Sequence, residues 1–72
     1  MKRLTAKERQ ILMLVAMDKT NAEISQELYI SERTVEYHIS SIIRKLDAKS
    51  RVGAVVNAIK NGEIDLNLKT PL

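Results

Sequence analysis

The fold is decided by residues 20–46, which read TNAEISQELYISERTVEYHISSIIRKL. The opening threonine and the glutamate three residues later match the capping box, in which each side chain accepts a hydrogen bond from the other's backbone N–H where a helix begins. We therefore expect a short helix over Asn21–Leu28, followed by a turn of about three residues. Ser31 then stands where it can cap a longer helix over Glu32–Leu46. A short capped helix, a tight turn and a longer helix form the layout of a helix-turn-helix.

The longer expected helix has one apolar side and one polar side. Its apolar residues recur at intervals of four, three and four positions, which aligns them on one inward stripe. They are Val35, Ile39, Ile42 and Leu46. The opposite side carries Arg33, Tyr37 and Arg44, with Ser40 and Ser41 on either side of them. Arginine, tyrosine and serine can contact phosphates or base edges, so this side is a candidate DNA-binding surface.

Two further helices complete the expected fold. One runs over Ala6–Met17 and begins at a second capping box, formed by Thr5 and Glu8. The last begins after Ser50 and stops at Asn61-Gly62, because glycine readily takes the left-handed conformation that ends helices. We expect Val52, Val55, Val56 and Ile59 to form its apolar side. The predicted fold class is all-α, with four helices around one core.

The chain is expected to form a single domain with a tail. The domain covers residues 1–62, and a short C-terminal tail covers residues 63–72. Apolar and polar residues alternate in the tail, which is a strand period, but a lone strand has nothing to pair with in a helical domain. We therefore expect Ile64 to pack back on the core, with Leu66 as a second candidate, and residues beyond Leu68 to be loose.

Composition limits the classes of function. The 72 residues contain neither Phe nor Trp, so the core must be aliphatic. Twelve Lys and Arg against nine Asp and Glu give a net charge of +3, which by itself is weak evidence for an anionic partner. The absence of cysteine and the single histidine, His38, argue against thiolate chemistry and zinc sites. The longest apolar run, Ile11–Met17, is too short to span a membrane. We expect neither an enzyme nor a cofactor, metal or membrane partner.

Three residues that can carry chemistry are interpreted as structural. His38 lies on the flank of the longer helix, where we expect a half-buried structural role, since no serine and aspartate accompany it as in a catalytic triad. We expect Tyr29, in the turn, to cover the helix pair by packing. Glu23 is assigned to helix capping and not to acid catalysis.

In order and spacing, these residues resemble the LuxR-type helix-turn-helix domain, also called the FixJ/NarL or GerE type, found at the C-terminus of many bacterial response regulators and quorum-sensing regulators. The resemblance covers about Leu4 to Asn61. It rests on Leu4-Thr5 with Glu8 and Ile11-Leu12, on Thr20-Asn21-Ala22-Glu23-Ile24, on Leu28 with Ile30-Ser31, on Thr34-Val35 with His38-Ile39, on Lys45-Leu46, and on Ser50-Arg51 with Ala54. It implies sequence-specific binding of double-stranded DNA in bacterial transcription regulation, in the cytoplasm at the nucleoid.

The resemblance also implies roles for particular residues. The base-reading positions of the family correspond here to Glu36, Tyr37 and Ser40. The phosphate-contacting positions correspond to Thr20, Asn21, Arg33, Thr34, Ser41, Arg44, Lys45, Ser50 and Arg51. The last helix commonly forms the dimer contact, for which Gly53, Ala54, Asn57 and Ala58 offer a side of small residues. The family thus implies a homodimer, which would contact RNA polymerase if it activates transcription. The resemblance also allows the chain to be the effector domain of a response regulator.

Glu36 departs from the family pattern, which usually has lysine at this position. A carboxylate near phosphates is repulsive and lowers non-specific affinity. It can instead accept a hydrogen bond from a cytosine amino group, or pair with Arg33 along the helix. Both interpretations of Glu36 stay open. The alternative for the whole domain is a helical protein–protein interaction module whose basic face is incidental.

Overall fold

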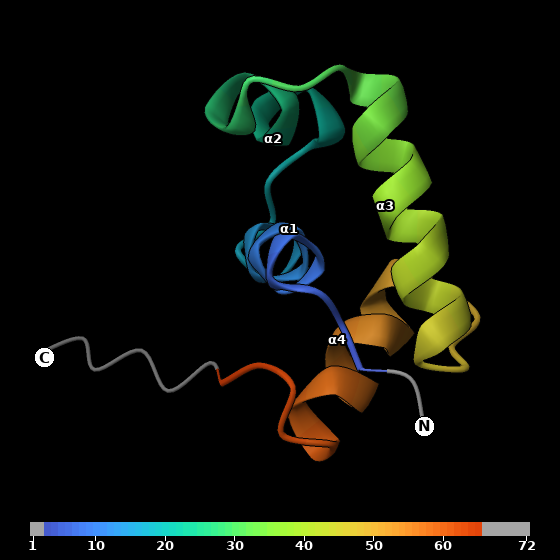
Figure 1. Ribbon diagram of the computed structural model, residues 1–72. Helices are drawn as coiled ribbons and strands as arrows, with labels where there is room; N and C mark the ends of the chain where they lie inside the picture. The colour runs from blue at the N-terminus through green and yellow to red at the C-terminus, as the bar shows by residue number, and fades with distance from the viewer. Residues whose placement is uncertain (1–2, 66–72) are drawn as a thin grey trace, which may run out of the picture.

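The structure, a computed structural model, describes residues 3–65 and shows four α-helices over them (Figure 1). They are α1 (Ala6–Ala16), α2 (Asn21–Leu28), α3 (Glu32–Lys45) and α4 (Arg51–Lys60). The predicted all-α architecture is confirmed, and no strand occurs within the described residues. Met17 and Leu46, which we expected as the last helical residues of α1 and α3, are the C-caps of those helices. Figure 1 looks along α1, with α2 and α4 on opposite sides of it and α3 extending across from the level of α2 to that of α4.

All four helices begin at the hydroxyl residue that the sequence predicts. In each case the side-chain oxygen accepts a hydrogen bond from the backbone N–H three residues later, at 3.0–3.1 Å. These caps are Thr5, Thr20, Ser31 and Ser50. The full capping box forms at α1 and α2, where Glu8 and Glu23 each accept from the N–H of the capping threonine at 2.8 Å. The helix starts are therefore encoded locally.

All four helices also end in the same way, with a residue in the left-handed region of backbone conformation. These residues are Asp18, Tyr29, Asp47 and Gly62, with φ of 64°, 57°, 52° and 73°. The N–H of the next residue donates to the carbonyl five positions earlier, at 2.8–3.1 Å, which is the pattern of the Schellman motif. Gly62 confirms the predicted stop after α4. The other three ends use residues that the sequence analysis did not single out for this purpose.

The core is aliphatic and lies where the four helices meet. Every residue of the predicted α3 stripe is buried, together with apolar residues of α1, α2 and α4. Ile64 is also buried, as predicted, whereas Leu66 and Leu68 lie outside the described residues. Arg9 donates to the Leu4 carbonyl at 3.0 Å and pairs with Glu63 at 3.3 Å, so the segment after α4 is fastened to the start of α1.

The orientation of α4 differs from the prediction for three of the four residues of the expected apolar side, whereas Val55 packs against the core as expected. Ala54 and Ala58 are fully buried, whereas Val52, Val56 and Ile59 are 70%, 44% and 42% exposed. Small side chains allow α4 to pack closely against α1 and α3, and this close approach turns Val52, Val56 and Ile59 outward. The predicted dimer contact through Ala54 and Ala58 is therefore wrong, because these residues belong to the core of a single chain.

The other two residues of the predicted dimer side are half-buried. The Asn57 amide donates to the Leu46 carbonyl at 2.9 Å, which ties α4 to the end of α3. Gly53 is half-buried near the start of α4. The side of small residues thus serves packing within the chain, and the exposed valines and Ile59 form the free surface of α4 instead.

Tyr29 does not cover the helix pair as we expected. Its side chain is 94% exposed, and its backbone takes the left-handed conformation that ends α2. The neighbouring Leu28 and Ile30 pack against the core in its place. The prediction for Tyr29 was wrong because the turn needs the residue's backbone and leaves its ring in solvent.

Candidate nucleic-acid interface

The outer side of α3 presents a continuous polar surface, which we call the α3 face. Its members are Arg33, Glu36, Tyr37, Ser40 and Arg44, and all five side chains are exposed. They lie opposite the buried stripe of the same helix, as its periodicity requires. Because α3 packs inward on α1, α2 and α4, the α3 face is the side left to meet a partner. The structure therefore brings together the three predicted base-reading residues and two predicted phosphate contacts.

Glu36 forms no ion pair with Arg33. The two ion pairs among the described residues join Arg9 to Glu63 and Lys45 to Glu8, and no hydrogen bond engages the Glu36 carboxylate. Of the two interpretations of Glu36, the structure thus gives no support to the intrahelical pair. The exposed carboxylate can still accept a hydrogen bond from a partner.

Tyr37 and His38 are in contact with each other on α3. Tyr37 is 71% exposed, and its ring meets that of the half-buried His38 edge-on, with centroids 5.7 Å apart and planes at 68°. Edge-to-face contact is a favourable arrangement of two aromatic rings. The half-buried position of His38 agrees with the structural role that we expected, and the contact restricts the Tyr37 ring that the α3 face presents.

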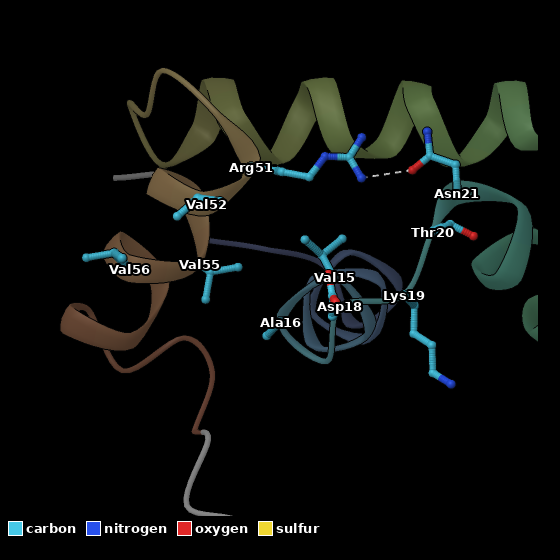
Figure 2. A pocket seen from close by; sticks show the side chains of 10 residues that line it. All are labelled: Val15, Ala16, Asp18, Lys19, Thr20, Asn21, Arg51, Val52, Val55 and Val56. Atoms are coloured by element: carbon cyan, nitrogen blue, oxygen red, sulfur yellow. Dashed lines mark hydrogen bonds between the residues drawn. The ribbon is translucent and has the colours of Figure 1, made fainter.

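A second cluster of predicted phosphate contacts lies where the N-terminus of α2 meets that of α4. The Arg51 guanidinium donates to the Asn21 side-chain oxygen at 3.0 Å, as the dashed line in Figure 2 shows. Thr20 and Ser50 cap the two helices and are exposed. Free backbone N–H groups at helix N-termini favour anions, and Arg51 adds a full positive charge. The cluster is thus suited to a phosphate.

A groove of about 520 Å³ lies next to this cluster. Its apolar part is formed by Val15, Ala16, Val52, Val55 and Val56, and its polar part by Asp18, Lys19, Thr20, Asn21 and Arg51. Figure 2 shows that the valines come from α1 and α4, while the polar residues lie at the N-termini of α2 and α4 and in the connection between α1 and α2. The groove therefore joins the exposed apolar side of α4 to the predicted phosphate contacts.

Three other predicted phosphate residues form side-chain hydrogen bonds within the chain, Thr34 at the surface and Ser41 and Lys45 with a buried carboxylate. Thr34 lies 2.9 Å from the capping hydroxyl of Ser31 and is half-buried. Ser41 donates to Glu8 at 3.0 Å, and Lys45 donates to the same carboxylate at 2.8 Å. The side chains of Ser41 and Lys45 are therefore directed toward α1 and away from the α3 face. The prediction treated them as free surface groups, which they are not.

The Glu8 carboxylate that holds them is almost fully buried, with 4% of the residue exposed. Burial acts to raise its pKa, but hydrogen bonds from Lys45, Thr5 and Ser41 outweigh it, and the net pKa lies below the ordinary value of 4.5. Glu8 is thus a charged acceptor in the folded state. The sequence identified it as a capping residue only, since its partners on α3 lie 33 and 37 positions away.

The described residues offer binding groups more than catalytic ones. Among them, no three His, Cys, Asp or Glu side chains lie close enough to hold a metal ion. Within the same part of the chain, no helix has the length and apolar character needed to cross a membrane. What the surface does provide is arginine, tyrosine, serine and helix N-termini, groups that bind nucleic acid.

Comparison with known proteins points the same way. The family model described as bacterial regulatory proteins, luxR family, matches residues 2–58. The spore germination protein GerE of Bacillus subtilis (strain 168) is 48% identical over 63 residues, which cover 88% of this chain and 85% of GerE. The transcriptional regulatory protein LiaR of the same organism is 48% identical over 58 residues, which cover 81% of this chain but 28% of LiaR.

Solved structures agree with the sequence relatives. The structure of the transcription factor GerE superposes with a TM-score of 0.85 and 39% identity, covering 93% of this chain and all of the other. The response regulator ChrA of a heme-sensing two-component system superposes with a TM-score of 0.84 and 31% identity, covering 89% of this chain and 32% of ChrA. The chain thus spans most of GerE, but about a third or less of the larger regulators LiaR and ChrA.

Proposed function

The chain belongs to the luxR family of bacterial regulatory proteins, and we propose that it reads a two-fold symmetric operator as a homodimer. It is a DNA-binding domain of the kind found in transcriptional regulators. In the proposed complex, α3 of each copy lies in the major groove, and the two half-sites lie about one helical turn, roughly 34–36 Å, apart. The observation that carries the proposal is the α3 face, a run of exposed polar side chains opposite the buried stripe.

Base reading is assigned to three neighbouring residues of the α3 face. They are Glu36, Tyr37 and Ser40, all exposed. They lie in the N-terminal and middle turns of α3, and the N-terminal residues of a recognition helix are the ones that meet base edges. Glu36 carries no partner within the described residues, so we assign it a cytosine amino group as donor.

Phosphate contacts are assigned to the borders of the α3 face. Arg33 and Arg44 lie near the two ends of α3, which allows them to reach the backbones on either side of the groove. The N-termini of α2 and α4 supply Thr20, Asn21, Ser50 and Arg51, and Thr34 completes the set near the start of α3. Ser41 and Lys45 are left out, because Glu8 holds both.

The dimer contact is assigned to the exposed apolar side of α4. Val52, Val56 and Ile59 recur at intervals of four and three, so they form one stripe along the helix. Burying these side chains between two copies would remove apolar surface from water. The stripe is short, so we expect weak association in solution and stronger association on DNA, where two linked half-sites raise the effective concentration.

Selection of bound duplexes from a random DNA pool tests the proposed function. We expect a two-fold symmetric consensus with half-sites one helical turn apart. Tyr37→Ala and Arg44→Ala should each weaken operator binding about tenfold or more. Lys60→Ala is the matched control, because Lys60 is an exposed cation at the far end of α4 and should have little effect.

A variant of α4 separates the homodimer from DNA binding in the same assay. Val56→Lys should abolish cooperative filling of the two half-sites and leave the affinity for one half-site nearly unchanged. A chain that binds no duplex at low salt would contradict the whole proposal. Equal losses in Tyr37→Ala and Lys60→Ala would show instead that the basic character is incidental and favour a protein–protein interaction module.

A further inference from the structure

The buried Glu8 carboxylate joins the start of α1 to the C-terminal half of α3. Its Oε1 accepts from the Thr5 backbone N–H at 2.8 Å and from the Lys45 ammonium at 2.8 Å. Its Oε2 accepts from the Ser41 hydroxyl at 3.0 Å. We call these contacts the Glu8 junction. A single side chain thus starts one helix and holds two residues of another, which lie four positions apart on the same side of α3.

The core residues shared by α1 and α3 are aliphatic. Ile11 and Leu12 of α1, Ile42 of α3 and the α3 C-cap Leu46 are all buried in the common core. Hydrophobic attraction is non-directional, so such a contact tolerates a small rotation of α3 about its axis. Hydrogen bonds are directional, and those of the Glu8 junction are satisfied only at one rotation. The apolar stripe decides which side of α3 is buried, and the junction adds a directional constraint on the exact rotation of α3 within that arrangement.

The junction also determines which cations of α3 are free. Lys45 and Arg44 are adjacent in sequence, yet the Lys45 side chain is 21% exposed and pairs with Glu8, whereas Arg44 is exposed. Hydrogen bonds from Lys45, Thr5 and Ser41 keep the pKa of Glu8 low despite its burial, so the carboxylate stays charged and neutralises the ammonium. Only Arg44 of this pair is therefore available to a phosphate.

We propose that Glu8 is a positioning residue for DNA recognition, which fixes the rotation of α3 on α1 and withholds the Lys45 ammonium from the DNA backbone. The inference rests on the proposed DNA-binding role of α3. It adds that selectivity depends on a residue outside the interface. Freed Lys45 would add a contact with phosphate, which carries no sequence information, while a loosened α3 would read bases less accurately.

The salt dependence of binding to a duplex with one operator half-site, which a single copy fills, and to a scrambled duplex of the same length tests this inference. Lys45→Gln should leave the slope of log affinity against log salt unchanged, because Lys45 contacts no phosphate in the native complex. Arg44→Gln is the matched control and should reduce the slope by about 0.9. Glu8→Gln keeps the shape of the side chain but frees Lys45, so it should steepen the slope by about 0.9 and lower the ratio of operator to scrambled affinity about tenfold.

Two outcomes would overturn the inference. One is a slope that falls by about 0.9 in Lys45→Gln, which would place Lys45 on the DNA in the native complex. The other is a Glu8→Gln chain that is folded by circular dichroism yet keeps both the slope and the affinity ratio. If Glu8→Gln does not fold, the double variant Ser41→Ala, Lys45→Gln decides the question. A positioning role requires that this variant shows a lower ratio of operator to scrambled affinity and an unchanged salt slope.

The inference and the proposed function fail in distinguishable ways. If the native chain shows no preference for any duplex, the proposed function is wrong. A double-mutant cycle of Glu8→Gln and Lys45→Gln on unfolding, measured without DNA, still reports whether the Glu8 junction couples α1 to α3. If the two substitutions lower the free energy of unfolding additively, the Glu8 junction does not couple the helices. If they are strongly coupled, the junction exists and only its proposed role in DNA recognition is wrong.

Discussion

Two helices of this domain begin with the same capping box, and the two boxes differ only in their surroundings. At α1, Thr5 and Glu8 exchange hydrogen bonds of 2.8 and 3.1 Å, and at α2, Thr20 and Glu23 exchange bonds of the same two lengths. Glu8 is buried and also holds two residues of α3, whereas Glu23 is exposed. The local hydrogen bonds of the capping box are therefore the same at α1 and α2, whereas the tertiary contacts of the two glutamates differ.

The difference shows how one sequence pattern can serve two purposes. The box at α2 satisfies backbone groups at the start of a helix. The box at α1 does the same and in addition anchors α3 through the Glu8 junction. A capping motif read from sequence predicts where a helix starts, but the energetic weight of its glutamate depends on what the fold brings beside it.

Alanine at the two glutamates is the strongest test of this comparison. Glu8→Ala leaves the Lys45 ammonium and the Ser41 hydroxyl without their partner, and we expect the free energy of unfolding to fall by about 3 kcal/mol. Glu23→Ala removes an exposed cap and should lower it far less. Urea unfolding followed by circular dichroism measures both. Losses of similar size would show that the Glu8 junction adds little to the cap.

The parts of this fold that could be predicted are those encoded by neighbouring residues. Caps and the α3 stripe depend on side chains three or four positions apart, so the helix starts and the buried side of α3 follow from the sequence. The exposed side of α3 follows in turn, because it lies opposite the stripe and carries Arg33, Tyr37, Ser40 and Arg44. Because of this local encoding, the sequence alone predicts most of the α3 face.

The parts that could not be predicted depend on contacts between distant segments. Helix α4 has two apolar sides, one with Val52, Val56 and Ile59 and one with the two alanines, and hydrophobicity alone favours the larger side chains for the core. The space left by α1 and α3 accepts the alanines instead. Likewise, nothing near Lys45 in the sequence indicates that Glu8, 37 positions earlier, will remove it from the free surface. Both wrong predictions concern which groups face the interior: one of two apolar sides in α4, and one of two neighbouring cations in α3.

Acid titration provides a second test of the comparison. Hydrogen bonds hold the pKa of Glu8 below its ordinary value, so its stabilising contribution is full above pH 4.5 and is lost as the pH falls through 4.5 toward the lower folded value. We expect Glu8→Gln to flatten the fall in stability below pH 4.5, measured as the urea midpoint against pH. The backbone hydrogen bond from Thr20 also lowers the pKa of Glu23, but that group is exposed, so Glu23→Gln should flatten the curve less.

The two threonines supply the smallest and most selective test, because they isolate the local part of each box. Thr5 and Thr20 are both exposed, and each accepts from the N–H three residues later at 3.1 Å. Thr5→Ala and Thr20→Ala should therefore each lower the free energy of unfolding by about 1 kcal/mol, and by the same amount. Equal losses beside unequal glutamate losses would assign the whole difference to the Glu8 junction. A larger loss in Thr5→Ala would mean that the hydroxyl helps to hold Glu8 toward α3, and the junction would then include the cap itself.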